Sequence, residues 1–113
     1  HNADGWRAAL AGAHPPADGR LWALVGVMRD KDAGTLADLL AVHGARVLAV
    51  GLDSDRALPA GDVADMLRQR GVVADAPRSA AEALAVFRRF AGPHDRMLVT
   101  GSHQTVAAVL REP

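Results

Sequence analysis

Apolar positions along the chain fall into two alternating patterns, which predict helices and buried strands in turn. Helical spacing of apolar residues is seen over residues 4–13 and around Leu36, Val63, Leu84 and Val106. Four shorter apolar runs lie between these segments, over residues 21–27, 46–50, 72–74 and 97–100. An unbroken apolar run of this length is typical of a parallel strand covered on both faces. The alternation predicts an α/β fold: a doubly wound, mainly parallel sheet with helices on both faces.

Local signals mark the ends of the predicted helices. Glycine or Gly-Pro follows the second, third and fourth helices, at Gly44, Gly71 and Gly92-Pro93. A Ser-x-x-Glu capping box, formed by Ser79 and Glu82, predicts the start of the fourth helix. We expect that helix to bury Leu84, Phe87 and Phe90, and we expect a last helix that carries Val106, Val109 and Leu110. Both tryptophans, Trp6 and Trp22, fit core positions.

Length and charge narrow the classes of protein that fit. A chain of 113 residues predicts a single domain over residues 1–113. Its 13 acidic and 13 basic residues cancel, which argues against nucleic acid or an acidic membrane as a partner. The absence of cysteine excludes a disulfide scaffold and a thiolate metal site. No apolar run approaches the ~20 residues that span a bilayer, and no signal peptide opens the chain. We therefore expect a cytoplasmic domain.

Two loops carry the candidate chemistry, because ligands of parallel α/β sheets collect outside the carboxyl ends of the strands. The segment Asp30-Lys31-Asp32 follows the first predicted strand, and Gly101-Ser102 follows the last. Lys31 is suited to a carboxylate or a phosphate, or is a solvated cation beside an Asp32 that caps the next helix. Ser102 is suited to an anion at a helix N-terminus, or is that helix's N-cap alone. Position alone leaves both alternatives open.

Several common motifs are absent from the sequence. There is no Gly-x-Gly-x-x-Gly after a strand, no Gly-x-x-x-x-Gly-Lys-Ser/Thr phosphate loop and no Ser-His-Asp arrangement. Three histidines have no metal-ligand spacing and are predicted to lie at the surface: His14, His43 and His94. Residue patterns alone therefore indicate a small parallel α/β domain with one edge suited to anions, and no metal site.

Four segments, taken in order, resemble folylpolyglutamate synthases and dihydrofolate synthases. His1-Asn2-Ala3-Asp4-Gly5 resembles the end of their Asp-Gly-Ala-His-Asn-Pro-x-Gly motif, with Ala3 in place of proline. Residues 26–32 are similar to their Gly-x-x-x-Asp-Lys-Asp motif. Residues 56–58 resemble their Arg-Ala-Leu segment, and residues 100–106 their Gly-Ser-x-x-x-Val segment. These enzymes are Mur-ligase-like amide ligases, and the resemblance covers nearly the whole chain.

The resemblance implies a Rossmann-like C-terminal glutamate-ligase domain of a larger two-domain enzyme. In that family ATP phosphorylates a carboxylate of dihydropteroate or of a folate glutamate tail. The amino group of L-glutamate then attacks the acyl phosphate. ATP and Mg²⁺ are expected to be bound mainly by an N-terminal ATPase domain. This sequence includes neither that domain nor the strand that is expected before residue 1. The isolated domain is therefore expected to be inactive.

The resemblance also assigns roles to residues. His1 and Lys31 are expected to act in catalysis, near the acyl phosphate and the incoming glutamate. Together with Ser102, they are expected to bind glutamate. Asn2, Asp30 and Asp32 match motif positions and are expected at most to orient the others. The Asp that precedes the His of the family motif, expected to bind the ATP ribose, is not part of this sequence.

Two other interpretations remain open at this point. A stand-alone α/β binding or receiver-like partner module would need an acidic cluster at a strand end. Only half of such a cluster is found, in the two carboxylates beside Lys31. A Mur ligase acting on a UDP-sugar-peptide would carry different loops where Asp-Lys-Asp stands here. A phosphate loop encoded upstream of residue 1 would favour the folate ligase, whereas a start codon near His1 would exclude it.

Overall fold

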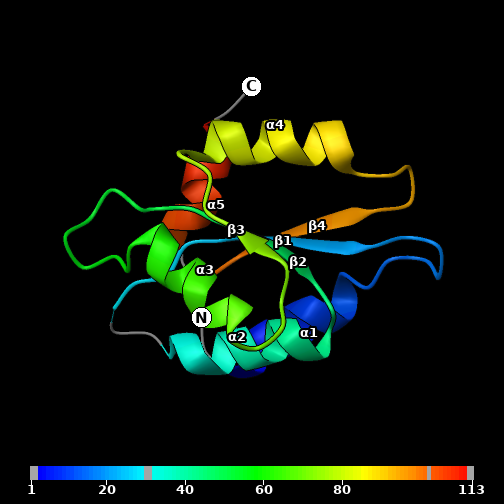
Figure 1. Cartoon of the computed structure of the whole chain (residues 1–113), viewed down its shortest axis with the longest axis horizontal. Coiled ribbons are helices and arrows are strands. Elements are labelled where there is room, and N and C mark those ends of the chain that lie inside the picture. Colours follow the sequence, from blue (N-terminus) through cyan, green and yellow to red (C-terminus); the bar gives the residue numbers. More distant parts are fainter. Residues whose placement is uncertain (1–2, 30–31, 102, 112–113) are drawn as a thin grey trace.

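Four parallel strands form the sheet around which the chain folds, in a computed structural model that describes residues 3–29, 32–101 and 103–111. The strands are β1 (Leu21–Val25), β2 (Arg46–Ala49), β3 (Ala74–Asp75) and β4 (Arg96–Thr100). The helices are α1 (Ala3–Gly12), α2 (Ala33–Val42), α3 (Ala60–Arg68), α4 (Ala80–Phe90) and α5 (His103–Leu110). The strand order is β3-β2-β1-β4, and every pair of neighbours is parallel (Figure 1). The predicted α/β fold is confirmed.

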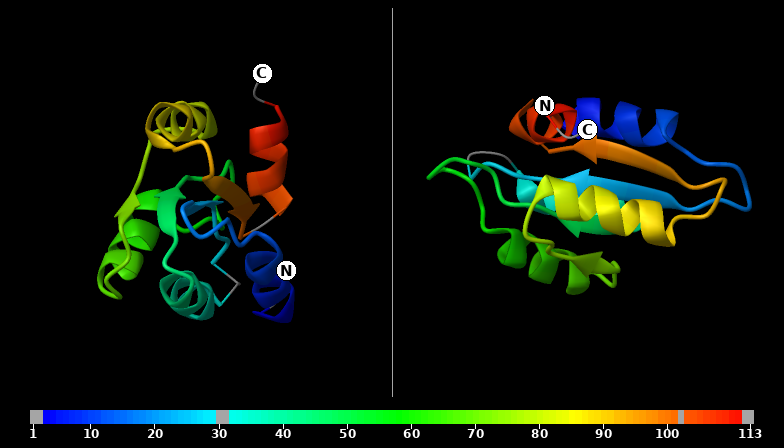
Figure 2. Two further views of the ribbon diagram at one scale, coloured as in Figure 1. Left: turned by 90° about the vertical axis from the view of Figure 1, so that its right-hand side faces the viewer. Right: turned by 90° about the horizontal axis from the view of Figure 1, so that it is seen from above.

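Helices cover the sheet on both faces, with α1, α2 and α3 on one side and α4 and α5 on the other (Figure 2). All five residues of β1 are buried, and they alternate between the two layers. Leu21, Ala23 and Val25 belong to the core under α1 to α3, while Trp22 and Leu24 face α4. A strand buried on both faces needs apolar residues at every position, which explains the unbroken run in the sequence. Within the described residues, no helix is long and apolar enough to cross a membrane.

The third strand lies two residues later than predicted. The sequence indicated residues 72–74, but β3 is Ala74–Asp75 and pairs with Val47 and Leu48 of β2. The backbone N–H of Val72 is already used, because it donates to the Leu67 carbonyl in the turn that ends α3. The apolar run at residues 72–74 was therefore read as a strand from its first residue, although the N–H of Val72 is bonded within the helix end.

Two helices have an exposed apolar residue at their last position. Phe90, which was expected to be buried, is 58% exposed, and Leu110 is 77% exposed. Each is the last residue of its helix and so lies beyond the part that packs on the sheet. The Arg89 guanidinium lies 5.3 Å from the centroid of the Phe90 ring, a contact compatible with an exposed aromatic side chain. The predicted burial of Leu84 is confirmed.

The predicted cap of α4 is confirmed in one of its two hydrogen bonds. The Ser79 hydroxyl accepts from the Glu82 N–H at 3.1 Å. The Glu82 carboxylate accepts from the N–H of Arg78 at 3.3 Å, one residue earlier than a reciprocal capping box would have it. The helix still begins at the residue after Ser79.

Asp95 ties the turn before β4 to the start of β1. Its two carboxylate oxygens accept from the N–H groups of Arg20 at 2.8 Å and Gly92 at 2.9 Å, and from the Trp22 indole N–H at 2.9 Å. The Trp22 indole, followed by the backbone N–H groups of Gly92 and Arg20, holds the pKa of Asp95 below its ordinary value of 3.8. The ionised carboxylate is thus the form that the fold stabilises.

We expect Asp95→Asn to lower the stability of the chain at neutral pH. Because the pKa of Asp95 is lowered in the folded state, its contribution is complete above 3.8 and is lost as pH falls through the folded pKa. The difference between the two proteins should therefore shrink in acid. Urea unfolding midpoints, measured at neutral pH and stepwise below 3.8, check this.

Asp53→Asn is the matched control, because Asp53 is exposed and has no hydrogen bond or ion pair in the described part of the chain. It removes one negative charge without removing an accepting group from the fold. A constant difference between Asp95→Asn and the parent chain at every pH would contradict the role given to the Asp95 charge.

Candidate functional site

Gly26 and Gly101 meet where β1 and β4 end, and neither position accommodates a side chain. Gly101 has φ +106°, a conformation that favours glycine, and a Cβ there would overlap the Gly26 carbonyl oxygen. A Cβ at Gly26 would lie 2.7 Å from Leu52 Cδ2 and 2.8 Å from Thr105 Oγ1. The two backbones are therefore in direct contact at the carboxyl edge of the sheet. That contact brings together the starts of the loops that carry the two candidate motifs.

Thr105 of α5 stabilises the contact between Gly26 and Gly101. Its hydroxyl donates to the Gly26 carbonyl at 3.0 Å, and the residue is fully buried. The bond attaches the first turns of α5 to the end of β1, across 79 residues of sequence. No role was predicted for Thr105, although it lies in the segment 100–106. The available signal was a hydroxyl residue directly before the apolar run of residues 106–110.

The loop after β2 runs back along the segment that leaves β1. The Leu58 N–H donates to the Val27 carbonyl at 2.8 Å, and the Arg29 N–H donates to the Arg56 carbonyl at 2.6 Å. Met28 and Ala57 form an antiparallel bridge between these two bonds. Residues 27–29 and residues 56–58 are thus one hydrogen-bonded unit, which projects from the edge toward which the strands point (Figure 1).

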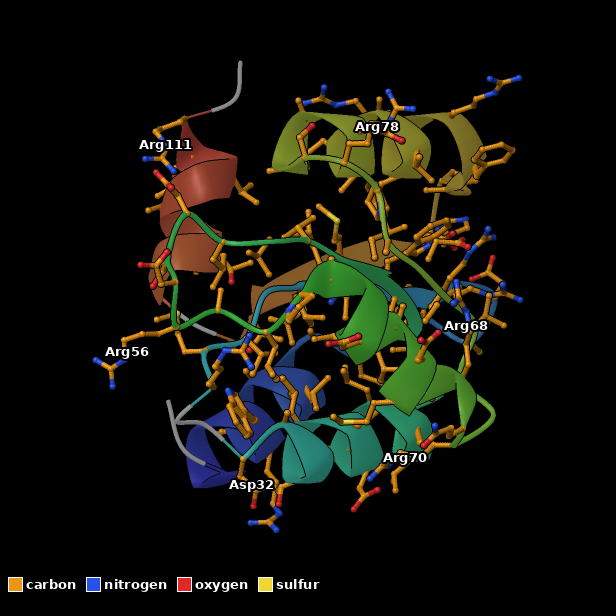
Figure 3. All side chains as sticks on the ribbon, turned by 60° about the vertical axis from the view of Figure 1, so that its left-hand side comes forward. Asp32, Arg56, Arg68, Arg70, Arg78 and Arg111 are labelled. Carbon is orange, nitrogen blue, oxygen red and sulfur yellow. The ribbon has the colours of Figure 1, made fainter. Side chains whose placement is uncertain are left out.

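Asp32 is the N-cap of α2. One of its carboxylate oxygens accepts from the Thr35 N–H at 3.1 Å, and the other accepts from the Thr35 hydroxyl at 2.5 Å. These two bonds, the hydroxyl first, lower the pKa of Asp32. Asp32 is exposed and lies at the end of α2 that faces the candidate loops (Figure 3). The interpretation of Asp32 as a helix cap is confirmed. Its negative charge also interacts favourably with the positive end of the helix dipole.

The other predicted site residues lie outside the described part of the chain: His1, Asn2, Asp30, Lys31 and Ser102. Their sequence neighbours are described and converge on one edge. α1 begins near α5, at the end of the sheet toward which the strands point (Figure 2). Arg29, Asp32 and Gly101 flank the two candidate loops. Among the described residues, no group of three His, Asp or Glu side chains is placed to hold a metal ion.

We expect Gly101→Ala to destabilise the chain by more than about 2 kcal/mol, because alanine is strained at this φ and its Cβ overlaps the Gly26 carbonyl. Gly61→Ala is the matched control. Gly61 lies in α3, and a Cβ there meets nothing within 4 Å. That change should be neutral or should stabilise by up to about 1 kcal/mol. Chemical unfolding of both variants checks this, and equal effects would rule out the contact as a structural constraint.

Comparison with known proteins gives a family and a set of similar folds. The family described as "Mur ligase, glutamate ligase domain" matches residues 1–103. E. coli FolC, solved in complex with DHPP and ADP, superposes with a TM-score of 0.82 at 26% identity. A bifunctional folylpolyglutamate synthase/dihydrofolate synthase from Yersinia pestis, solved with AMPPNP and Mn, gives 0.79 at 26% identity. Another structure of such an enzyme, with Mn, AMPPNP and L-glutamate bound, gives 0.76 at 25% identity.

These alignments cover 97% of this chain but only 26% of each of the three solved chains. The chain therefore spans about a quarter of the length of the proteins that it matches. No curated protein sequence gives a significant match. The family match nevertheless extends over all the strands, from the segment before α1 to the start of α5. The chain belongs to the Mur ligase family and is a glutamate ligase domain of that family.

Proposed function

We propose that this domain binds L-glutamate within an ATP-dependent amide ligase that adds glutamate to dihydropteroate, to folate glutamate tails, or to both. The family is one of ATP-dependent amide ligases. One similar structure holds DHPP and ADP, and another holds Mn, AMPPNP and L-glutamate. ATP and Mg²⁺ are assigned to an N-terminal ATPase domain that acts with this one, and the expected location is cytoplasmic.

The observation that carries the proposal is the contact between Gly26 and Gly101. It joins the segments 26–32 and 100–106, which are the two that resemble the glutamate-handling motifs of folate ligases. Lys31 is one residue from the N-cap Asp32, and Ser102 is one residue from Gly101. Glutamate brings two carboxylates, and a lysine together with a helix N-terminus is a chemically suitable pair of partners for them.

In the proposed reaction, the amino group of L-glutamate attacks the carbonyl carbon of an acyl phosphate. An amide C–N bond forms, the C–O bond to phosphate breaks, and inorganic phosphate leaves. Lys31 stabilises the negative charge on the departing phosphate or on a glutamate carboxylate, and His1 lies near the same groups. Ser102 holds a glutamate carboxylate, while Asn2, Asp30 and Asp32 orient the loops. The described residues offer no set of metal ligands, so no step in this domain is assigned to Mg²⁺.

The test uses the full-length enzyme that carries this domain. ATP- and glutamate-dependent phosphate release is measured with dihydropteroate and with tetrahydrofolate in separate assays. Lys31→Ala should lower kcat/KM for glutamate by about a hundredfold or more, because a charge that faces the transition state is removed. Lys31→Arg, which keeps the charge, should recover part of the loss. No phosphate release with either acceptor, from a folded enzyme, would contradict the proposed function.

Lys31 is also the only lysine in the chain, which allows a direct binding measurement. Reductive ¹³C-methylation labels the Lys31 amine and the chain's amino terminus alone. Titration of the labelled chain with L-glutamate should shift the Lys31 signal, and titration with D-glutamate should leave it unchanged. A Lys31 signal that does not respond to saturating L-glutamate would contradict the role given to Lys31 in binding glutamate.

A further inference from the structure

The outer side of β4, which faces away from β1, carries backbone groups that have no partner in the described part of the chain. In the pairing of β4 with β1, the Arg96 N–H donates to the Arg20 carbonyl at 3.1 Å. Backbone groups of successive strand residues point to opposite sides, so every second residue from Arg96 onward pairs with β1. The N–H and C=O groups of Met97 and Val99 therefore face outward, and none of them has a hydrogen bond among the described residues.

β4 is also less covered than β1. All five residues of β1 are buried, whereas Met97, Leu98 and Val99 at the centre of β4 are partly exposed. Their side chains nevertheless pack on both core layers, Leu98 on the layer of α1 to α3 and the other two on the layer of α4. Strands with a free side normally carry charged residues or proline, and in β4 only the first residue, Arg96, is of this kind. β4 thus has the sequence of an inner strand.

The strand at the opposite side of the sheet, β3, is closed by a side chain. It has only two residues, and its Ala74 carbonyl faces outward because the preceding carbonyl, that of Val73, bonds to β2. The Arg68 Nε donates to the Ala74 carbonyl at 2.9 Å (Figure 3). The same guanidinium lies 3.2 Å from Asp65 and 3.8 Å from Asp75. An arginine held in this way occupies the place that a further strand would need. The sheet is therefore closed beside β3 and open beside β4.

The hand of the crossovers determines which strand fits the open side. β1 leads through α2 to β2, and β2 leads through α3 to β3, both over the face that α1 also covers. Both steps run from the β4 side of the sheet toward the β3 side. Crossovers between parallel strands are right-handed in about 98% of cases. Since α1 covers the same face and leads into β1, a strand before α1 has to lie on the β4 side of β1. β4 occupies the place next to β1, which leaves the outer side of β4.

The position of α1 agrees with this. A crossover helix lies between the two strands that it connects, and α1 packs against β4 as well as against α2 (Figure 2). It begins at the end of the sheet toward which the strands point, where a parallel strand before it would finish. In the described part of the chain, α2, α3 and α4 each join two strands, whereas α1 leads into β1 without a strand before it.

We propose that the outer side of β4 is the docking site of a fifth parallel strand, supplied by the segment that precedes α1 in the parent polypeptide. The N–H and C=O groups of Met97 and Val99 pair with this strand. It finishes where α1 begins, which brings the junction between them to the end of β4, beside Gly101. His1 and Asn2 belong to that junction. If the proposed function holds, the glutamate site is therefore incomplete without the strand, whereas the docking site itself rests on the sheet alone.

Amide hydrogen exchange, followed by ¹⁵N–¹H NMR, tests the docking site. The 113-residue chain is compared with the same chain extended at its amino end by about ten residues of the parent polypeptide, enough for one strand and its turn. In the 113-residue chain, the N–H groups of Met97 and Val99 should exchange fast, and those of Leu98 and Thr100, which pair with β1, should exchange slowly. In the extended chain, Met97 and Val99 should exchange at least about a hundredfold more slowly.

Proline substitutions at the two outer strands give a matched pair of variants. Val99→Pro and Ala74→Pro each remove one N–H that faces outward and keep the N–H groups that pair with the neighbouring strand. For each variant, the gain in urea midpoint that the extension produces is measured, so that the effect of the substitution on the chain itself is subtracted. Val99→Pro should abolish most of this gain, and Ala74→Pro should leave it unchanged. Should a proline variant not fold, the exchange comparison decides alone, because it needs no substitution.

The proposal is overturned if Met97 and Val99 exchange equally fast in both chains, or if the extension slows Ala74 instead. Slow exchange of Met97 and Val99 that appears in the 113-residue chain as its concentration rises would identify a second copy as the occupant. Slow exchange that requires an extension after α5 would identify that segment, and either result also overturns the proposal. No glutamate or ATP is present, so a failure here is separate from a failure of the proposed function.

Discussion

The contact between the Gly26 and Gly101 backbones is the constraint on which the carboxyl edge of this domain depends. β1 and β4 pair along five residues, and the segments that follow the two strands then leave the sheet side by side. Only glycine allows both to do so, because a Cβ at either position would overlap neighbouring atoms. The Thr105 hydroxyl donates a hydrogen bond to the Gly26 carbonyl, so this buried carbonyl has a partner. The two loops that match glutamate-ligase motifs therefore start from one fixed point.

At the amino edge, a single carboxylate provides the corresponding constraint. Asp95 accepts from two backbone N–H groups and from the Trp22 indole, and thereby sets how the turn before β4 meets β1. Trp22 in turn contacts Phe87 edge-on, with ring centroids 5.4 Å apart, and supports Arg46 on its face. One tryptophan thus joins the α4 layer, the sheet and Arg46 at the amino edge.

The sequence predicted what depends on neighbours along the chain, and it failed where distant segments decide. Helix ends at Gly44 and Gly71 and the N-caps Asp32 and Ser79 follow from local hydrogen bonds, and these were predicted. The exposure of Phe90 depends instead on where the sheet ends beneath α4. The pairing of residues 27–29 with 56–58, and the bond from Thr105 to Gly26, join segments that no local pattern relates. The sequence therefore indicated two candidate loops for the site, but not the contacts that fix where these loops begin.

The two edges should act independently, because the strands between them have a single packed arrangement. β1 has five residues and so separates its ends by about 16 Å, which exceeds the ~8 Å screening length at physiological ionic strength. Coupling through the sheet would require an element with two stable positions, whereas β1 is buried on both faces and hydrogen-bonded on both sides. A contact made at the amino edge should therefore leave the arrangement of the carboxyl edge unchanged.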